Sequence, residues 1–248
     1  MPSPKRPKSD GRCVHCREVL AERTKDHVFP DSWYPASTPA KVQRWTVPSC
    51  RRCNGDSGKL ENEVFVPLAL CVNPLKIASA GLSKRALRAL GVGVRGLDDE
   101  EKRRRRAVME RVFRDAKPYS VEVQPYVLPG LGPHPEAPHN QQLQIMVPGG
   151  KLQEVFGKIV RGCEYWLANG RIVEPPYQVS IYFVHDADVP DVVRAFAPFG
   201  PVHLGPGFRV RRAGAHDEPL TSLYEIVLWD TLKFFGVIDR AEAPDVPA

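Results

Sequence analysis

The sequence lacks several features that would place the protein in a specialised class. It has no run of about 18 apolar residues, the length typical of a membrane-spanning helix. Its first residues are rich in proline and lysine and lack the apolar stretch of a secretory signal. It also shows no internal repeat and no heptad pattern. We therefore expect a cytoplasmic protein that does not associate with membranes.

Hydrophobic and charged residues are present in the proportions of a folded protein. The 248 residues are 42% hydrophobic and 26% charged, enough for cores in one large or two modest domains. The charge is unevenly distributed, because residues 1–117 hold 25 basic and 14 acidic side chains, whereas residues 118–248 hold 10 and 15. The first half is where a polyanion such as nucleic acid is expected to bind.

Four of the six cysteines form two C-x-x-C pairs, Cys13 with Cys16 and Cys50 with Cys53. Disulfides are rare in a reducing cytoplasm, and each pair can direct two thiolates at one centre from a tight knuckle. Together the pairs predict a structural Zn²⁺ site, since a closed four-thiolate shell leaves no open position for a substrate. His15 lies inside the first knuckle and is an alternative ligand.

Asp26 and His27 stand side by side between the two cysteine pairs, and Asn54 directly follows the second pair. Hydrolysis of a phosphodiester needs a base to deprotonate water, a Lewis acid, and positive charge near the transition state. An imidazole next to a carboxylate can supply the base and a metal ligand. Consecutive residues of a strand point to opposite sides, so a bend near Pro30 is needed if both are to face one site.

Basic side chains surround these residues. Candidates for contacts with the phosphate backbone are Lys25, Arg51, Arg52 and Lys59. The four arginines at 103–106 either contact nucleic acid or form a solvated helix face, because four consecutive residues cannot all face one groove.

The order of these motifs resembles the four-cysteine form of the HNH endonuclease family. The family pattern is C-x-x-C, then Asp-His followed by an apolar residue and proline, then C-x-x-C followed by Asn or His; the match covers residues 13–65. The resemblance implies a ββα-metal fold that holds a catalytic divalent ion, Mg²⁺ or another metal, beside the structural zinc. It also implies that His27 is the general base and that Asp26 and Asn54 are ligands of the catalytic ion.

Two positions depart from the family pattern. Trp45 stands where the family has a middle asparagine that helps to orient the base, so either a main-chain carbonyl orients His27 or the base is less well fixed. Ser57 stands in the place of the usual lysine, and Lys59 follows two residues later. On the same helix, Glu61 and Glu63 are either an added metal ligand or surface charges.

The pattern along the chain predicts an α+β fold class. We expect a disordered basic tail (1–12), an N-terminal zinc-stapled ββα-metal, HNH-like module (13–75), a basic helical connector (76–117), a C-terminal mixed α/β domain (118–240) and a second tail (241–248). Asp98 and Glu101 form a capping pattern for a helix that ends before Pro118. The strongest helical periodicity covers 151–168, and a short helix is expected at 189–199. Strands are expected at 121–128, 143–147, 178–184, 207–213 and 222–237.

The function expected from these residues is metal-dependent hydrolysis of nucleic-acid phosphodiester bonds, with DNA as the expected substrate. The alternative is a zinc-dependent module that binds nucleic acid without cutting it, which the tryptophan at position 45 keeps open. By analogy with the family, the nuclease is expected to act as an effector in bacterial defence, and the C-terminal domain to dock a protein partner.

Overall fold

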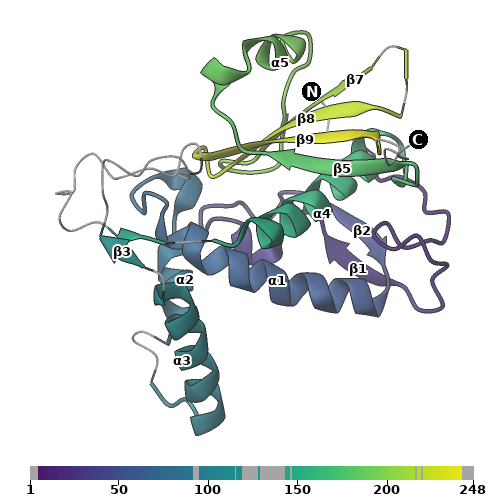
Figure 1. Ribbon diagram of the computed structural model, residues 1–248. Coiled ribbons are helices and arrows are strands. Elements are labelled where there is room, and N and C mark those ends of the chain that lie inside the picture. Colours follow the sequence, from purple (N-terminus) through teal and green to yellow (C-terminus); the bar gives the residue numbers. More distant parts are fainter. Residues whose placement is uncertain are drawn as a thin grey trace, which may run out of the picture.

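The computed structural model contains helices and strands in both halves of the chain (Figure 1). It describes residues 5–91, 95–114, 116–118, 128, 143–145, 147–215, 217–218 and 220–241. The helices are α1 (Arg51–Leu70), α2 (Leu82–Ala89), α3 (Asp99–Phe113), α4 (Gly149–Leu167) and α5 (Pro190–Ala195). The strands are β1 (Thr24–His27), β2 (Thr46–Ser49), β3 (Lys117–Pro118), β4 (Leu143–Gln144), β5 (Tyr177–Tyr182), β6 (Val202–His203), β7 (Arg209–Gly214), β8 (Ser222–Leu228) and β9 (Leu232–Arg240). No described helix is long and apolar enough to cross a membrane.

The C-terminal half is built on a five-stranded antiparallel sheet with the strand order β5-β9-β8-β7-β6. Figure 1 shows α4 against one face of this sheet and α5 above the other. The predicted helix over 151–168 is observed as α4, whose apolar stripe packs on the sheet; the rings of Phe156 and Phe234 are 4.4 Å apart. On the opposite face, Phe196 at the end of α5 stacks on Phe235 of β9.

The N-terminal half begins with a two-stranded antiparallel sheet followed by a long helix. In the β1–β2 register, Asp26 lies opposite Val47 and His27 opposite Thr46. Helix α1 begins directly after β2 with Cys50 as its N-cap, and the Cys50 sulfur accepts a hydrogen bond from the Cys53 amide. Helices α1 and α4 lie side by side (Figure 1). The second cysteine pair therefore forms the junction between strand and helix.

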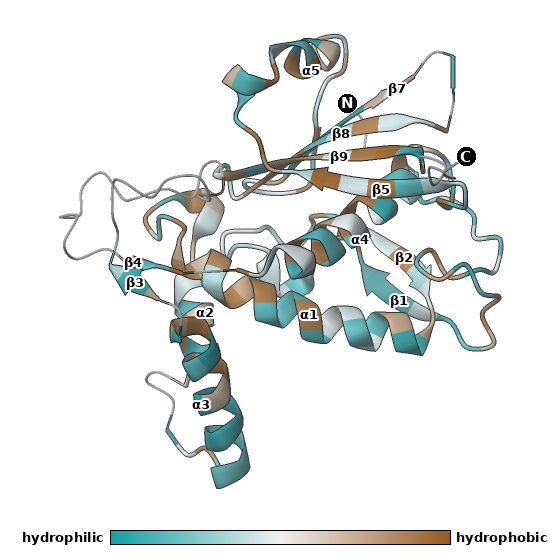
Figure 2. Ribbon diagram, in the orientation of Figure 1, coloured by the Kyte–Doolittle hydropathy of each residue, from teal (hydrophilic) through white to brown (hydrophobic). Residues whose placement is uncertain are grey.

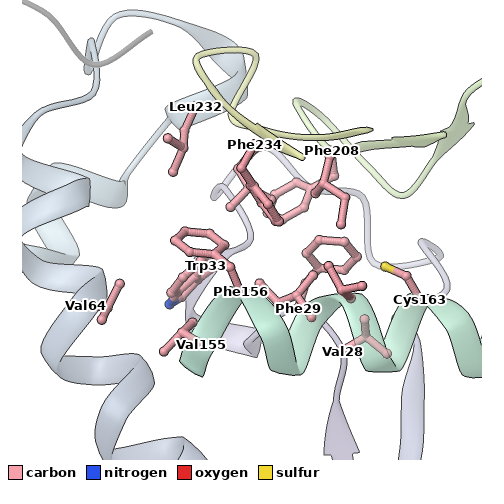
Figure 3. Close-up of a cluster of buried hydrophobic side chains, with 14 of the residues drawn as sticks. Val28, Phe29, Trp33, Val64, Val155, Phe156, Cys163, Phe208, Leu232 and Phe234 are labelled. Carbon is pink, nitrogen blue, oxygen red and sulfur yellow. The ribbon is translucent and has the colours of Figure 1, made fainter. Parts of the chain in front are cut away.

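One hydrophobic cluster joins the two halves (Figure 3). The rings of Phe29 and Phe208 meet edge to face at 5.3 Å, and those of Trp33 and Trp229 lie 5.6 Å apart. The indole of Trp229 also donates a 2.8 Å hydrogen bond to the carbonyl of Trp33. Among the described residues, this cluster includes side chains from both sides of the predicted division at 117/118.

The predicted connector contains α2 and α3. Asp98 caps α3 by accepting a 2.8 Å hydrogen bond from the Glu101 amide, as the capping pattern predicts. No residue of α3 is fully buried, and the helix projects away from the body with a largely hydrophilic surface (Figure 2). The predicted strand at 121–128 lies outside the described residues except for position 128.

The predicted N-terminal tail is described from residue 5 onward and lies against the fold. Pro7 is buried, and Arg12 pairs with both Asp10 and Glu174. Gly170, with a φ of +89°, lets the tail approach: a Cβ at that position would lie 3.0 Å from the Lys8 carbonyl oxygen. The predicted C-terminal tail lies outside the described residues except for Ala241.

Candidate metal centre and active site

The two cysteine knuckles meet at one point. The sulfur atoms of Cys13, Cys16, Cys50 and Cys53 all lie within 4.8 Å of one another. The Cys16 and Cys50 sulfurs are 3.8 Å apart, which matches the edge of about 3.8 Å in a tetrahedron with Zn–S bonds of about 2.3 Å. The four predicted cysteines thus form a group that can hold a structural metal ion such as zinc. Among the described residues, no other group of three or more His, Cys, Asp or Glu side chains is so arranged.

Backbone amides favour the thiolate form of Cys13, whereas burial raises the pKa of Cys16 and Cys53. The Cys50 amide donates to the Cys13 sulfur, and the Cys53 amide donates to the Cys50 sulfur, each at 3.4 Å. Burial opposes ionisation of Cys13, but hydrogen bonds from surrounding backbone amides outweigh it and lower the pKa of this thiol to about 6. Metal binding requires deprotonated cysteine, so the fold prepares at least one ligand before the ion arrives.

Asp26 and His27 end strand β1 and follow its regular alternation. Asp26 points to the face covered by α1 and α4, where its partners lie, and is only 4% exposed. His27 comes next in an unbroken register and therefore points to the opposite face. The bend that would turn both side chains toward one site is absent from β1.

Asp26 is the centre of a buried network of charges. His15, between the cysteines of the first knuckle, donates from Nε2 to Asp26 Oδ2 at 2.9 Å. Lys158 of α4, 3% exposed, lies with Nζ 2.8 Å from Asp26 Oδ1 and also pairs with Glu61 of α1. The same ammonium donates a 2.7 Å hydrogen bond to the carbonyl oxygen of His27. One lysine thus joins α4, β1 and α1.

This network determines the protonation of Asp26. Burial alone would raise the pKa of the carboxyl group, but the His15 hydrogen bond and the Lys158 charge outweigh burial and hold that pKa below its usual value. Burial raises the pKa of Glu61, and Lys158 acts in the opposite direction. Asp26 is therefore ionised and is compensated by a cation of the chain itself.

The surroundings of Asp26 do not fit a divalent cation. Each carboxylate oxygen already faces a nitrogen donor, and the Lys158 ammonium at 2.8 Å would repel a second cation. An ion at Asp26 would need Lys158 to leave a site from which water is nearly excluded. As the side chains stand, they form an ion pair rather than the metal ligand set that the family resemblance implies.

His27 is half-buried. Burial is the main cause that lowers the pKa of His27, and the charges of Arg44 and Lys158 lower it further against the opposing effect of Asp26. The imidazole is therefore neutral at pH 7. Its buried Nδ1 atom has no hydrogen-bond partner within the described parts of the chain.

Trp45 is a core residue. It is 1% exposed and stacks on Trp166 of α4 with ring centroids 5.1 Å apart and planes within 4°. The Trp166 indole donates a 3.1 Å hydrogen bond to the Thr46 carbonyl. The carbonyl of Trp45 itself accepts from the Val28 amide and not from the His27 ring. The position where the family has an orienting asparagine thus anchors β2 to α4.

Asn54 links the start of α1 to β1. Its amide nitrogen donates to Thr24 Oγ1 at 3.2 Å and approaches the Lys25 carbonyl at 3.5 Å. This contact brings the last residue of the sequence motif against the strand that carries Asp26 and His27.

The predicted phosphate contacts are all exposed, but they differ in their neighbours. Arg51 pairs with Glu22 at 3.2 Å and Arg52 with Glu18 at 3.6 Å. Lys59 is 4.0 Å from Asp56. For Lys25, in contrast, no acidic oxygen lies within 4.0 Å among the described residues.

Sequence reasoning missed Lys158 and assigned His15 another role. The only sequence signal for Lys158 is a lysine within the most apolar helical segment. Glu61 is a partly buried partner of that lysine, whereas Glu63 pairs with Lys151 and Arg111 nearer the surface. Neither glutamate therefore belongs to a metal cluster.

Comparisons of this chain with protein families, curated proteins and solved structures give no match.

Proposed function

We propose that this protein is an endonuclease that hydrolyses phosphodiester bonds in nucleic acid, with DNA as the expected substrate and His27 as the general base. The observation that carries the proposal is the contact of Asn54 with β1. Through it, motif residues that lie far apart in the sequence share one junction between strand and helix, next to the four-cysteine cluster.

His27 has the properties that a general base requires. It is neutral near pH 7 because burial lowers its pKa, so it can accept a proton from water. It shares a face of β1 with the exposed Lys25, since residues two apart on a strand point the same way. A phosphate group on that face would meet a base and a cation together. A requirement for Mg²⁺ or another divalent ion is part of the proposal, but we assign no step to an ion at Asp26.

A second candidate is a zinc-dependent module that binds nucleic acid without cutting it. The observation in its favour is the saturation of Asp26 by His15 and Lys158. If Asp26 serves only to hold the fold together, the basic surface can bind a polyanion without any catalytic ion. A role in bacterial defence and a protein partner for residues 118–240 stay predictions.

Cleavage of supercoiled plasmid in Mg²⁺, Mn²⁺ or EDTA tests the proposal. We expect His27→Ala to lower the cleavage rate by roughly 10²- to 10⁴-fold, as for a lost general base, with zinc content and thermal unfolding nearly unchanged. The matched control is His203→Ala, which removes an exposed histidine from β6 and should cut normally.

Each result has a separate meaning. Undiminished cutting by His27→Ala would exclude His27 as the base. If the wild-type protein binds DNA but never cuts it in any of the three conditions, the binding module is the correct function. Asp26→Asn separates the two roles of that carboxylate, because added Mg²⁺ should partly rescue a lost ligand but not a lost structural ion pair.

A further inference from the structure

An open pocket of about 400 Å³ lies beside the start of β1. Three of its five lining side chains are cations, and the lining residues are Arg6, Pro7, Ser9, Arg23 and Lys25. Arg23 and Lys25 flank Thr24, the first residue of β1, while the other three belong to the N-terminal segment. The pocket therefore forms only because that segment lies against the fold.

Packing holds the N-terminal segment in place. Pro7 is buried, and the Lys8 carbonyl lies close to Gly170, shortly after α4, where a Cβ would be only 3.0 Å from the carbonyl oxygen. Arg6 and Arg23 both act electrostatically on Tyr165, a buried residue of α4, which places the two guanidinium groups in one neighbourhood. Two cations far apart in the sequence thus converge.

The charge in this pocket is not neutralised by the protein. Among the described residues, no carboxylate lies within 4.0 Å of the side-chain nitrogens of Arg6, Arg23 or Lys25. Nearby acidic groups are engaged elsewhere, since Asp10 pairs with Arg12 and Glu22 with Arg51. Three converging and uncompensated cations create a positive potential that attracts an anion.

We propose that this pocket binds a backbone phosphate of the nucleic acid on which the protein acts. The inference rests on the proposed function, because the pocket includes Lys25, which shares the outer face of β1 with His27. Guanidinium groups bind phosphate oxygens in a bidentate manner, and a lysine adds a point charge. Arg6 and Arg23 are thus phosphate contacts in addition to those expected from the sequence.

The test measures how DNA binding depends on salt. In the full chain carrying His27→Ala to prevent cleavage, Arg23→Gln with Lys25→Gln removes two cations, and fluorescence anisotropy on a short duplex follows binding from low to high salt. Each neutralised phosphate contributes about 0.9 to the slope of log K against log salt, so the double variant, which loses the single phosphate of the pocket, should lose up to about 0.9 of slope and about tenfold in affinity. Arg6→Gln alone should lose about half of that slope.

The matched control removes the same charge elsewhere. Lys102→Gln with Arg194→Gln neutralises two exposed cations on α3 and α5, each paired with an aspartate three residues earlier, and should hardly change the slope. Equal losses in both double variants would overturn the pocket, because only total charge would then matter. If the wild-type protein cuts DNA but the pocket variant binds DNA like the control, the phosphate-binding proposal is wrong and the endonuclease proposal stands. If the pocket variant loses slope but the wild-type protein never cuts DNA, the phosphate-binding proposal stands and the endonuclease proposal is wrong. If the protein does not bind DNA at all, both proposals are wrong.

Discussion

At the scale of single residues, Asp26 illustrates how one side chain can match a catalytic motif and still be committed to structure. Its carboxylate is buried, ionised and held between His15 and Lys158. A buried ion pair of this kind adds little net stability compared with apolar residues, but removing one partner is costly because a charge is left uncompensated. Lys158 compensates two carboxylates, so the cost should be large there.

We predict that Lys158→Met destabilises the protein by about 3–5 kcal/mol, because the buried Asp26 and the partly buried Glu61 would both lose their cation. The matched control is Lys151→Met on the same helix. Lys151 pairs with Glu63 where both side chains are about one-third exposed, so its loss should cost less than about 1 kcal/mol. Urea unfolding of the two variants measures the difference. Equal free energies of unfolding would show that the buried network contributes no more than a surface pair.

Glycines on α4 decide how closely other elements approach the helix. A Cβ at Gly162 would lie 2.8 Å from two methyl carbons of Val28, directly after β1, whereas a Cβ at Gly157 would meet no atom closer than 3.6 Å. Helix α4 therefore contacts the N-terminal half through a position that needs a residue without a side chain.

We expect Gly162→Ala to destabilise the protein by about 1–3 kcal/mol, since the added methyl group overpacks Val28. Gly157→Ala should have the opposite effect and stabilise by roughly 0.5–1 kcal/mol, because alanine favours the helix and the space is free. Thermal unfolding of the two variants gives the sign of each change. A stabilising Gly162→Ala would mean that Val28 moves away at no cost.

Elements with strong local patterns could be predicted from the sequence, and their pairing could not. Helix α4 follows from apolar spacing, and the four-cysteine cluster from two C-x-x-C pairs. The segment 222–237 is predicted as strand, but it is observed as β8 and β9 joined by a turn that contains Trp229 and Asp230, both with positive φ. The Trp229–Asp230 pair is not the Asn-Gly or Asp-Gly pair that signals a tight hairpin turn in a sequence.

The candidate site shows the same limit. The order of Asp26, His27 and Asn54 in the sequence identifies them as candidates, but the cation that faces Asp26 comes from a helix more than a hundred residues later. The stacking of Trp45 on Trp166 is equally distant in sequence. Such contacts depend on which helix covers β1 and β2, and periodicity within one segment contains no information on that choice.

At the scale of the whole molecule, the first cysteine knuckle and the C-terminal sheet contribute to one hydrophobic cluster. The hydrophobic cluster runs from Val14 in the first knuckle to Phe234 and Ile238 in β9. Because this core is continuous, we expect a change at the metal site to lower the stability of the C-terminal sheet as well as that of β1 and β2.

We therefore predict that loss of the metal weakens the entire chain. Cys50→Ser removes one ligand of the metal while serine can still cap α1, so the remaining site should no longer close the loop between the two knuckles. Hydrogen exchange should show lower protection in β1, β2, β8 and β9 together, and thermal unfolding should keep one transition at a lower midpoint. Cys71→Ser is the matched control, because this exposed cysteine lies outside the cluster and its replacement should change neither measurement. A different result would contradict this prediction: β8 and β9 stay fully protected in Cys50→Ser while β1 and β2 lose protection. The C-terminal sheet with α4 would then be an independent folding unit, and the shared core would contribute little to cooperativity.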